Sequence, residues 1–461
     1  MEPKKPISAS EPAAADVSPL PLTDAAHGDD KTDVPPPSMT LALRGLRLVL
    51  ILGLVATAGT GVWAWRGKAD AKRWALRGDF VRARSGLRRY LWLFPRDAEA
   101  RLQLARALAT DDALLPKQRW PEAFALLQSI DDRTPQGFEA RMCEARLAFL
   151  VRLQPTHAEQ LVRRALALKP KSRDAWFLLW KILDMTGRGD ESETVFQQVL
   201  ALAAADERTW CLREWFLSQF APGLANADLD RALGFLKPDE TAGPACEFQR
   251  LLAFRNAERS SPLNHAALAR WFERQGDFEQ ALKILRESSG LPGAYANRYF
   301  VFALVETYLK AGQADLAEKY FVDCPGDRAG YEYWRLQGIL HEEAHRDYAQ
   351  AVTAYDRAMM TWPGPADWRT VLRKAQCLRA LGKADEAEQC RAAGEKIRTD
   401  LFGAPNQKAL LDAAARLTEP RQLDVIAGYY MSLGRRNEAA LWRKASPLTG
   451  NETGFVQRIS N

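Results

Sequence analysis

The chain has 461 residues, a formal net charge of +6, 47% hydrophobic residues and 26% charged residues. A chain of this length exceeds one compact hydrophobic core, and its ordinary hydrophobic content excludes a wholly disordered protein. Its six cysteines include no C-x-x-C pair, so we expect free buried thiols rather than a disulfide framework or a zinc ribbon.

The chain begins with a segment of low apolar content. Residues 1–40 are rich in Pro, Ala, Ser and Asp and contain three lysines against seven acidic residues, a net charge of −4. No apolar periodicity runs through them, and such composition does not bury enough surface to order a chain. We predict a disordered tail over residues 1–43.

An uncharged apolar stretch follows at residues 48–65. As a helix with its flanks it spans about 30 Å, the thickness of the hydrocarbon layer of a bilayer. Trp63 and Trp65 at its end suit a membrane interface. We predict one transmembrane helix over residues 44–67. The alternative is a cleaved signal peptide, although a leading region of 47 residues is unusually long for one.

The charge around this stretch bears on its orientation. Residues 41–110 carry fourteen Lys or Arg against four acidic residues, and most of these cations follow the apolar stretch. The positive-inside rule therefore favours repeats in the cytoplasm and a translocated tail, with the opposite topology open. The basic surface also suits anionic lipid head groups.

The clearest pattern in the chain is a pair of helices within Tyr331–Pro363. Trp334 and Gly338 stand one helical turn apart in the first helix, and Pro363 ends the second. This order resembles the tetratricopeptide repeat, a helix pair of about 34 residues. The second helix carries an apolar stripe of helical period formed by Tyr348, Ala351, Tyr355 and Ala358.

About nine stretches show this pattern, which predicts an all-α fold, a right-handed solenoid of stacked helix pairs, rather than an unrelated helical bundle. Prolines and glycines interrupt it at residues 218–262, where we expect a bend, and residues 111–119 read as a loop insertion. The predicted parts after the apolar helix are N-terminal repeats at 68–220, an irregular helical region at 221–262, C-terminal repeats at 263–445 and a tail at 446–461.

The resemblance implies a concave groove, lined by the first helix of each pair, that binds peptides or proteins. Some members of the family clamp a terminal carboxylate with Lys and Asn, and that set is absent here. The matching positions predict a mixed, partly apolar groove for segments with aromatic or aliphatic anchors. These positions are Leu102 and Arg106, Phe177 and Lys181, Cys211 and Trp215, Ala266 and Arg270, and Phe302 and Glu306.

One motif suggests a different function. His341, Glu342 and His345 have the spacing H-E-x-x-H, which resembles the signature of zinc metallopeptidases and places two imidazoles on one helix face. Charged Glu343 lies inside the motif, the motif falls at the end of a repeat helix, and Asp356, a candidate third ligand, belongs to no motif of its own. We therefore expect no metal site.

Signatures of nucleotide-binding loops and of serine hydrolases are absent from the sequence. We expect a membrane-anchored scaffold or adaptor that binds a protein partner, without a catalytic residue, a cofactor, a nucleic acid or a small-molecule substrate. Two alternatives stay open: a membrane-bound zinc-dependent hydrolase that uses the H-E-x-x-H motif, and a permanent structural subunit of a membrane or envelope complex.

Overall fold

The computed structural model describes residues 65–111, 116–237 and 243–448, together with Arg47, Leu50, Ile51, Val62 and Trp63. The predicted tail at 1–43, most of the predicted transmembrane stretch and residues 449–461 lie outside the described residues. The chain divides into two compact units, Met1–Trp63 and Ala64–Asn461, and the second contains the repeats. Among the described residues no helix has the length and apolar character needed to cross a bilayer.

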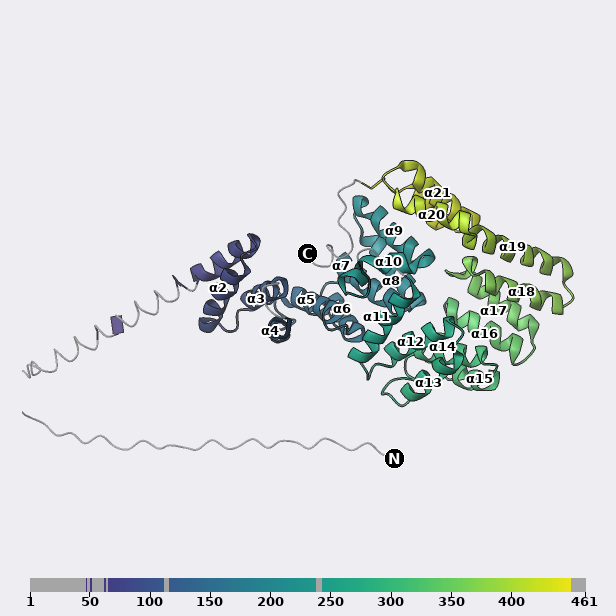
Figure 1. The fold of residues 1–461 in the computed structure, drawn as a ribbon, viewed down its shortest axis with the longest axis horizontal. Helices are drawn as coiled ribbons and strands as arrows, with labels where there is room; N and C mark the ends of the chain where they lie inside the picture. Colours follow the sequence, from purple (N-terminus) through teal and green to yellow (C-terminus); the bar gives the residue numbers. More distant parts are fainter. Residues whose placement is uncertain are drawn as a thin grey trace, which may run out of the picture. The chain divides into compact units, whose positions relative to one another are not determined.

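Every regular element in the described part of Ala64–Asn461 is a helix (Figure 1). A helical stretch at residues 65–76 precedes the first complete pairs. The helices that follow are α2 (Phe80–Leu93), α3 (Ala98–Thr110), α4 (Pro116–Gln128), α5 (Gly137–Leu150), α6 (Pro155–Leu168), α7 (Arg173–Met185), α8 (Gly189–Leu202), α9 (Ala205–Phe220), α10 (Pro222–Ala232), α11 (Pro244–Ala257), α12 (Pro262–Arg274), α13 (Phe278–Ser288), α14 (Arg298–Lys310), α15 (Ala314–Val322), α16 (Tyr331–Glu343), α17 (Tyr348–Met359), the 3₁₀ helix η1 (Gly364–Ala366), α18 (Trp368–Ala380), α19 (Ala384–Phe402), α20 (Ala404–Ala415), α21 (Pro420–Ser432) and α22 (Arg436–Arg443).

Helices that are neighbours in sequence pack as pairs, and each pair packs on the next. Helix α12 contacts α13, its own second helix, and α14, the first helix of the following pair; α14 in turn contacts α15 and α16. Each unit therefore buries its apolar face against its neighbours rather than in a central core. This arrangement confirms the predicted all-α helical-repeat solenoid.

A glycine followed by an aspartate makes the turn between α12 and α13. Gly276 follows α12 with φ of 85°, a conformation that costs glycine little, and its N–H donates to the carbonyl of Glu273 at 3.0 Å. Asp277 then caps α13 by accepting a hydrogen bond from the N–H of Gln280 at 3.0 Å. The chain thus reverses within a few residues, which holds the two helices of the pair together.

The pair α16–α17 depends on a close approach at Gly338. A Cβ atom at this position would lie 2.4 Å from Cε1 of Tyr355, whose side chain is fully buried. The Tyr355 hydroxyl donates to Oε2 of Glu342 at 2.5 Å, so the ring is held by its polar end as well. The small and large residues of the sequence pattern are therefore complementary across this interface.

Several prolines begin helices where the sequence pattern suggested interruptions. Pro222 and Pro244 stand in the first turn of α10 and α11, where the missing N–H has no intrahelical partner to lose. Pro116 likewise begins α4, so residues 116–119 are helical rather than part of a loop insertion. The described residues of 221–262 are mostly in two helices.

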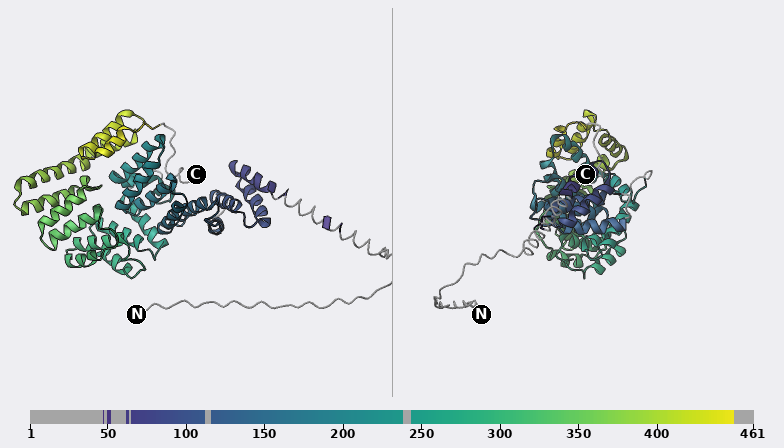
Figure 2. Two further views of the ribbon diagram at one scale, coloured as in Figure 1. Left: turned by 180° about the vertical axis from the view of Figure 1, so that it is seen from behind. Right: turned by 90° about the vertical axis from the view of Figure 1, so that its left-hand side faces the viewer.

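Helices far apart in the sequence meet at α9. The Trp215 ring stacks on Tyr430 of α21 with ring centres 5.6 Å apart, and on Phe196 of α8 at 5.3 Å. The Tyr430 hydroxyl donates to Oε1 of Gln219 at 3.1 Å. The two views in Figures 1 and 2 show α9 beside the C-terminal helices. The C-terminal pair α21–α22 is thus part of the fold around α9.

The cysteines agree with the expectation of free thiols. All six are unpaired with one another, and Cys211, Cys246 and Cys377 are buried. Burial raises the pKa of the Cys377 thiol to about 12, so this group stays protonated and unreactive at neutral pH.

Candidate functional site

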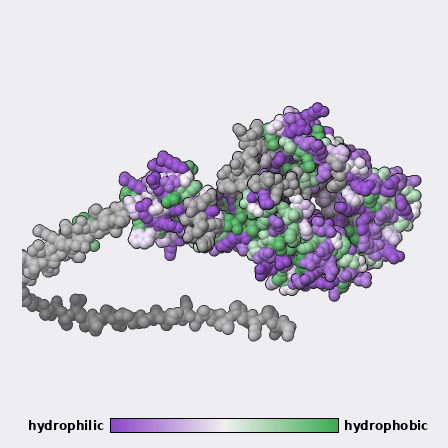
Figure 3. All heavy atoms as spheres, viewed as in Figure 1, coloured by the Kyte–Doolittle hydropathy of each residue, from purple (hydrophilic) through white to green (hydrophobic). Residues whose placement is uncertain are grey.

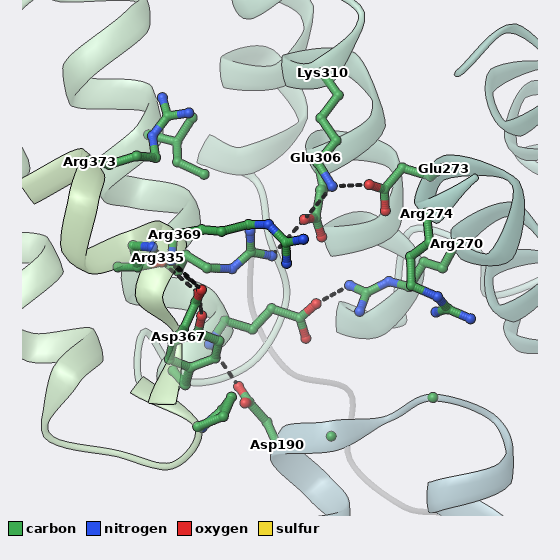
Figure 4. Close-up of a pocket in the computed structure, with 17 residues that line it drawn as sticks. Asp190, Arg270, Glu273, Arg274, Glu306, Lys310, Arg335, Asp367, Arg369 and Arg373 are labelled. Atoms are coloured by element: carbon green, nitrogen blue, oxygen red, sulfur yellow. Dashed lines mark hydrogen bonds and ion pairs between the residues drawn. The ribbon is translucent and has the colours of Figure 1, made fainter. Parts of the chain in front are cut away.

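A charged cavity of about 430 Å³ lies against the first helices of four successive pairs (Figure 4). Its walls come from α12, α14, α16 and α18, together with the start of α8. The charged residues that line it are Asp190, Arg270, Glu273, Arg274, Glu306, Lys310, Glu332, Arg335, Asp367, Arg369 and Arg373.

Each of these four helices presents two polar side chains that are four residues apart. Residues at this spacing lie on one face of a helix, one turn above the other, so each helix directs both members of its pair to the cavity. The pairs are Arg270 and Arg274 on α12, Glu306 and Lys310 on α14, Tyr331 and Arg335 on α16, and Arg369 and Arg373 on α18.

Ion pairs connect the helices that form the cavity wall. Arg270 of α12 pairs with Glu332 of α16, and Glu306 of α14 lies 2.8 Å from Nη2 of Arg335. Lys310 pairs with Glu306 at 3.3 Å and with Glu273 of α12. Most of these side chains are largely shielded from water. The two members of each pair therefore depend on each other, because a buried charge without its partner is destabilising.

Asp190 connects α8 to the same wall. Its Oδ2 accepts a hydrogen bond from the backbone N–H of Glu332 at 3.1 Å, in the first turn of α16. Burial and the nearby Glu332 carboxylate raise the pKa of Asp190 to about 7, although Arg298 and Arg270 act in the opposite direction. A residue from the N-terminal repeats therefore belongs to a site built mainly by the C-terminal ones.

The start of α18 is ordered by Asp367. Its Oδ1 accepts hydrogen bonds from the N–H groups of Arg369 at 3.1 Å and Thr370 at 3.4 Å, and its Oδ2 accepts from the Thr370 hydroxyl at 2.7 Å. The Tyr331 hydroxyl of α16 also donates to Asp367. This cap fixes the direction in which Arg369 leaves the helix.

Lys310 is the lysine of the cavity, and its pKa is lowered to about 8. Burial is the largest cause, and the positive charges of Arg335, Arg270 and Arg369 add to it. Burial and the neighbouring arginines thus both disfavour the charged form of Lys310.

Some of the predicted groove residues lie in the core, and others lie at the surface. The apolar members Leu102, Phe177, Cys211, Ala266 and Phe302 are buried in helix packing, and none of them lines the cavity. Arg270 and Glu306, the charged members one turn further along α12 and α14, do line it. The predicted apolar positions of the groove are thus part of the core, and the residues of the set that line the cavity are charged.

Other predicted groove positions are occupied by the protein itself. Lys181 is fully buried, and its Nζ lies 3.2 Å from Oε2 of Glu214 and 3.1 Å from the carbonyl of Ala225. Trp215 is covered by Tyr430, as described above. Arg106 is exposed and pairs with Glu139 at 2.6 Å, in the next helix pair. These residues do not join the cavity.

The H-E-x-x-H motif lies at the end of α16. The rings of His341 and His345 are 5.8 Å apart, and His345 Nε2 lies 3.0 Å from Oε1 of Glu318. Glu342, which would be the general base of a peptidase, is held by the Tyr355 hydroxyl and by Nε of Arg373 at 2.8 Å. Asp356, the candidate third ligand, pairs with Lys374 at 2.6 Å. In the described ranges no group of His, Cys, Asp or Glu is arranged to hold a metal ion.

Part of the cavity wall lies in a segment that matches a known protein family. Residues 336–395 match the model of the tetratricopeptide repeat. This segment is therefore similar to tetratricopeptide repeats. It extends from the second half of α16 into α19 and contains Asp367, Arg369 and Arg373, so part of the cavity wall lies in the segment that matches the repeat model.

Several solved structures are similar to this chain, all at low sequence identity. The APC/C hetero-tetramer Cut9–Hcn1 has 12% identity over 86% of this chain and 75% of that chain, with a TM-score of 0.34. A tetratricopeptide repeat protein from Parabacteroides merdae has 10% identity over 73% of this chain and 100% of that chain, with a TM-score of 0.25. Pseudomonas aeruginosa pilF has 16% identity over 49% of this chain and 92% of that chain, with a TM-score of 0.24. No curated protein sequence matches the chain significantly.

Proposed function

We propose that this chain is a helical-repeat scaffold that binds a segment of a partner protein in the cavity along α12, α14, α16 and α18. One observation carries the proposal. Four successive first helices direct pairs of polar side chains to one shared cavity, while the apolar side chains of the same helices are buried in the stack. An extended segment crossing these helices would meet several of the pairs in turn.

The ion pairs of the wall support a binding role. Arg270, Glu306, Arg335 and Glu332 are held by one another before any partner arrives, so little side-chain entropy is lost on association. Charged groups arranged in this way contribute mainly to the choice of partner and to the rate of encounter. On the face seen in Figure 3, hydrophilic residues cover much of the repeats after α12, which is consistent with a partner that is selected by polar contacts.

The membrane attachment of this scaffold is a further part of the proposal, and it rests on the sequence alone. Residues 48–65 carry no charge and have the length of a membrane-spanning helix, and cations follow them. We propose a single-pass anchor with the repeats on the cytoplasmic side.

The contacts of Glu342 favour a scaffold over a zinc-dependent hydrolase. A general base must reach a metal-bound water, whereas the carboxylate of Glu342 is engaged by Tyr355 and Arg373 between α16, α17 and α18. The side chain therefore serves the packing of the repeat.

Site-specific photo-crosslinking in cells tests the scaffold proposal. A photoreactive amino acid in place of Arg274, which lines the cavity, is expected to crosslink to a discrete protein partner. The matched control is the same amino acid in place of Lys283, an exposed residue on α13, the second helix of the same pair. Equal crosslinking from both positions, or none from position 274, would contradict the proposal. A partner without which the chain is insoluble would identify a permanent subunit rather than an adaptor.

A further inference from the structure

Three exposed aromatic side chains lie on the first helical hairpin, which consists of the helix at residues 65–76, the turn after it and α2. Trp65, at the start of the first helix, is 66% exposed, and Trp92 and Phe94, at the end of α2, are 82% and 42% exposed. Within the described part of the chain, Trp92 makes no ring contact and no hydrogen bond. The packing of the repeats therefore leaves much of these rings in water, where they are available to a partner.

Contacts between the two helices place these rings at one end of the hairpin. A Cβ atom on Gly86 of α2 would lie 3.0 Å from the carbonyl oxygen of Gly67, so the middle of α2 passes beside the start of the first helix. Nζ of Lys68 lies 2.9 Å from Oδ2 of Asp97, which joins that start to the turn after α2. The end of α2 therefore lies near the start of the first helix, and Leu76 lies at the opposite end, before the turn.

Arg66 and Arg96 belong to the same end as the aromatic rings. Both are exposed, and neither side chain makes an ion pair or a hydrogen bond with another residue that the structure describes. The nearby carboxylates of Asp97 and Glu99 are paired with Lys68, at 2.9 and 2.8 Å. This end of the hairpin therefore presents aromatic rings together with positive charge that no neighbouring carboxylate compensates.

The positive charge of the hairpin persists when its neighbours are counted. Residues 65–99 contain ten Lys or Arg against four Asp or Glu. Two carboxylates from the following segments also pair with α2: Asp111 lies 2.7 Å from Arg84, and Glu122 lies 2.6 Å from Arg88. A surplus of four positive charges remains when these two are included, so the surface has a charge complementary to that of an anionic partner.

The combination of exposed rings and cations is suited to a membrane surface. Tryptophan rings lie favourably at the level of the lipid head groups, and nearby Lys and Arg are attracted to anionic lipids. Trp65 is also the last residue of the uncharged apolar stretch at 48–65, so this end of the hairpin is the one that adjoins the proposed anchor in the chain. A nucleic acid would also attract the cations, but the adjoining apolar stretch favours lipid.

We propose that this end of the hairpin rests on the surface of the membrane, with Trp92 and Phe94 among the head groups and Arg66 and Arg96 on the phosphates of anionic lipids. This inference rests on the proposed membrane attachment and adds a second, peripheral contact made by the repeats themselves. An anchor and a surface contact together fix the direction in which the repeats leave the membrane, which a single spanning helix with a flexible junction does not.

Photo-crosslinking in liposomes tests this proposal on the full-length protein. The protein is reconstituted in phosphatidylcholine, with or without added phosphatidylglycerol, and carries a photoreactive amino acid in place of Trp92. The matched control has the same amino acid in place of Leu76, which is 83% exposed and lies at the opposite end of the same hairpin. Lipids attached to the protein are identified by mass spectrometry.

We expect lipid crosslinks from position 92 and none from position 76. In the mixed liposomes, phosphatidylglycerol should form a larger share of the crosslinked lipid than of the bilayer. Arg96→Gln should reduce this enrichment by about three- to fivefold, because it removes one charge at the surface. Arg77→Gln, which changes an exposed arginine in the turn at the opposite end, should leave the enrichment unchanged.

The outcomes separate this inference from the anchor. Protein that inserts in the liposomes but gives no lipid crosslink at position 92, or equal yields at positions 92 and 76, would overturn the inference and leave the anchor standing. Crosslinks from position 92 to added RNA in place of lipid would assign the surface to nucleic acid and overturn it too. An enrichment that Arg96→Gln does not change would overturn the phosphate contact. Protein that does not float with the liposomes would refute the anchor and this inference together.

Discussion

Gly338 shows how one residue decides the geometry of a repeat. Its missing side chain leaves the space that the Tyr355 ring fills, and that ring brings its hydroxyl to Glu342. Glu342 in turn pairs with Arg373 on α18. The contact between α16 and α17 thus also orients a residue of the cavity.

We predict that Gly338→Ala destabilises the protein by about 2 kcal/mol, because the added methyl group would overlap a buried ring. Gly428 in α21 is the matched control, since a Cβ there meets no atom within 4 Å. Gly428→Ala should be neutral or stabilising by roughly 0.5–1 kcal/mol, because alanine favours the helix. Urea unfolding followed by circular dichroism measures both, and an equal effect of the two changes would refute the close-approach argument.

Asp190 predicts a pH dependence of stability. Its pKa of about 7 in the folded protein lies above the ordinary value of 3.8, so the fold favours the protonated acid. The stability that this group contributes is complete below about pH 4 and is lost as the pH rises through 7. In Asp190→Asn the side chain stays neutral throughout.

We therefore expect the unfolding free energy of the unaltered protein, minus that of Asp190→Asn, to fall by about 4 kcal/mol between pH 4 and pH 8. Denaturant titrations of both proteins at a series of pH values give this difference. The contributions of titrating groups that behave alike in the two proteins cancel in it. A difference that is constant with pH would show that the carboxylate is not held in the environment described.

At the scale of elements, some features of the helices follow from the local sequence, and others depend on contacts between helices that are far apart in the chain. The turn at Gly276 and Asp277 follows from local backbone preferences. The packing of α9 against α21 does not, because it joins Trp215 and Tyr430 across some two hundred residues of chain. Aromatic stacking and one hydrogen bond, from Tyr430 to Gln219, hold these elements together.

We predict graded effects at Tyr430, which is fully buried. Tyr430→Phe removes only the hydrogen bond to Gln219 and should cost about 1 kcal/mol. Tyr430→Ala also removes the ring and should cost about 3–5 kcal/mol. Hydrogen exchange should show faster exchange in α20–α22 while α12–α18 keep their protection. Uniform loss of protection along the repeats would instead indicate one cooperative unit.

At the scale of the whole molecule, ion pairs of the cavity connect consecutive repeats within Ala64–Asn461, and one of them, between Arg270 and Glu332, joins α12 to α16. A solenoid gains its stability from such contacts between neighbours, and its binding surface exists only when several units are stacked. A single helix pair taken from this chain would present only a few of the polar side chains of the cavity.

The topology of the chain is also a property of the whole molecule. With a reporter fused after Asn461 that is active on one side of the membrane, we expect the signal of a cytoplasmic C-terminus, because cations follow the apolar stretch at 48–65. A reporter active only outside would reverse the proposed orientation and reopen the signal-peptide alternative. If the fusion protein is not associated with the membrane, the proposed anchor is refuted.

The sequence by itself determined the helical repeat, because helical period, turn residues and small-to-large complementarity act over a few residues. The pattern of Trp334, Gly338 and Tyr355 predicted the pair α16–α17 without knowledge of the rest of the chain. The polar pairs of the cavity, such as Glu306 and Lys310, were also visible as residues four apart, but this spacing is common on exposed helix faces.

Only the tertiary structure decided which of these faces meet. Stacking places Arg270 against Glu332, although 62 residues separate them, and brings Asp190 to α16 across 142 residues. The same stacking buries Phe302 and leaves Glu306 in the cavity, so the lining is charged where the sequence predicted a mixed, partly apolar groove. A repeat pattern specifies contacts between neighbouring helices, whereas the angle that accumulates over several repeats determines which distant side chains come together.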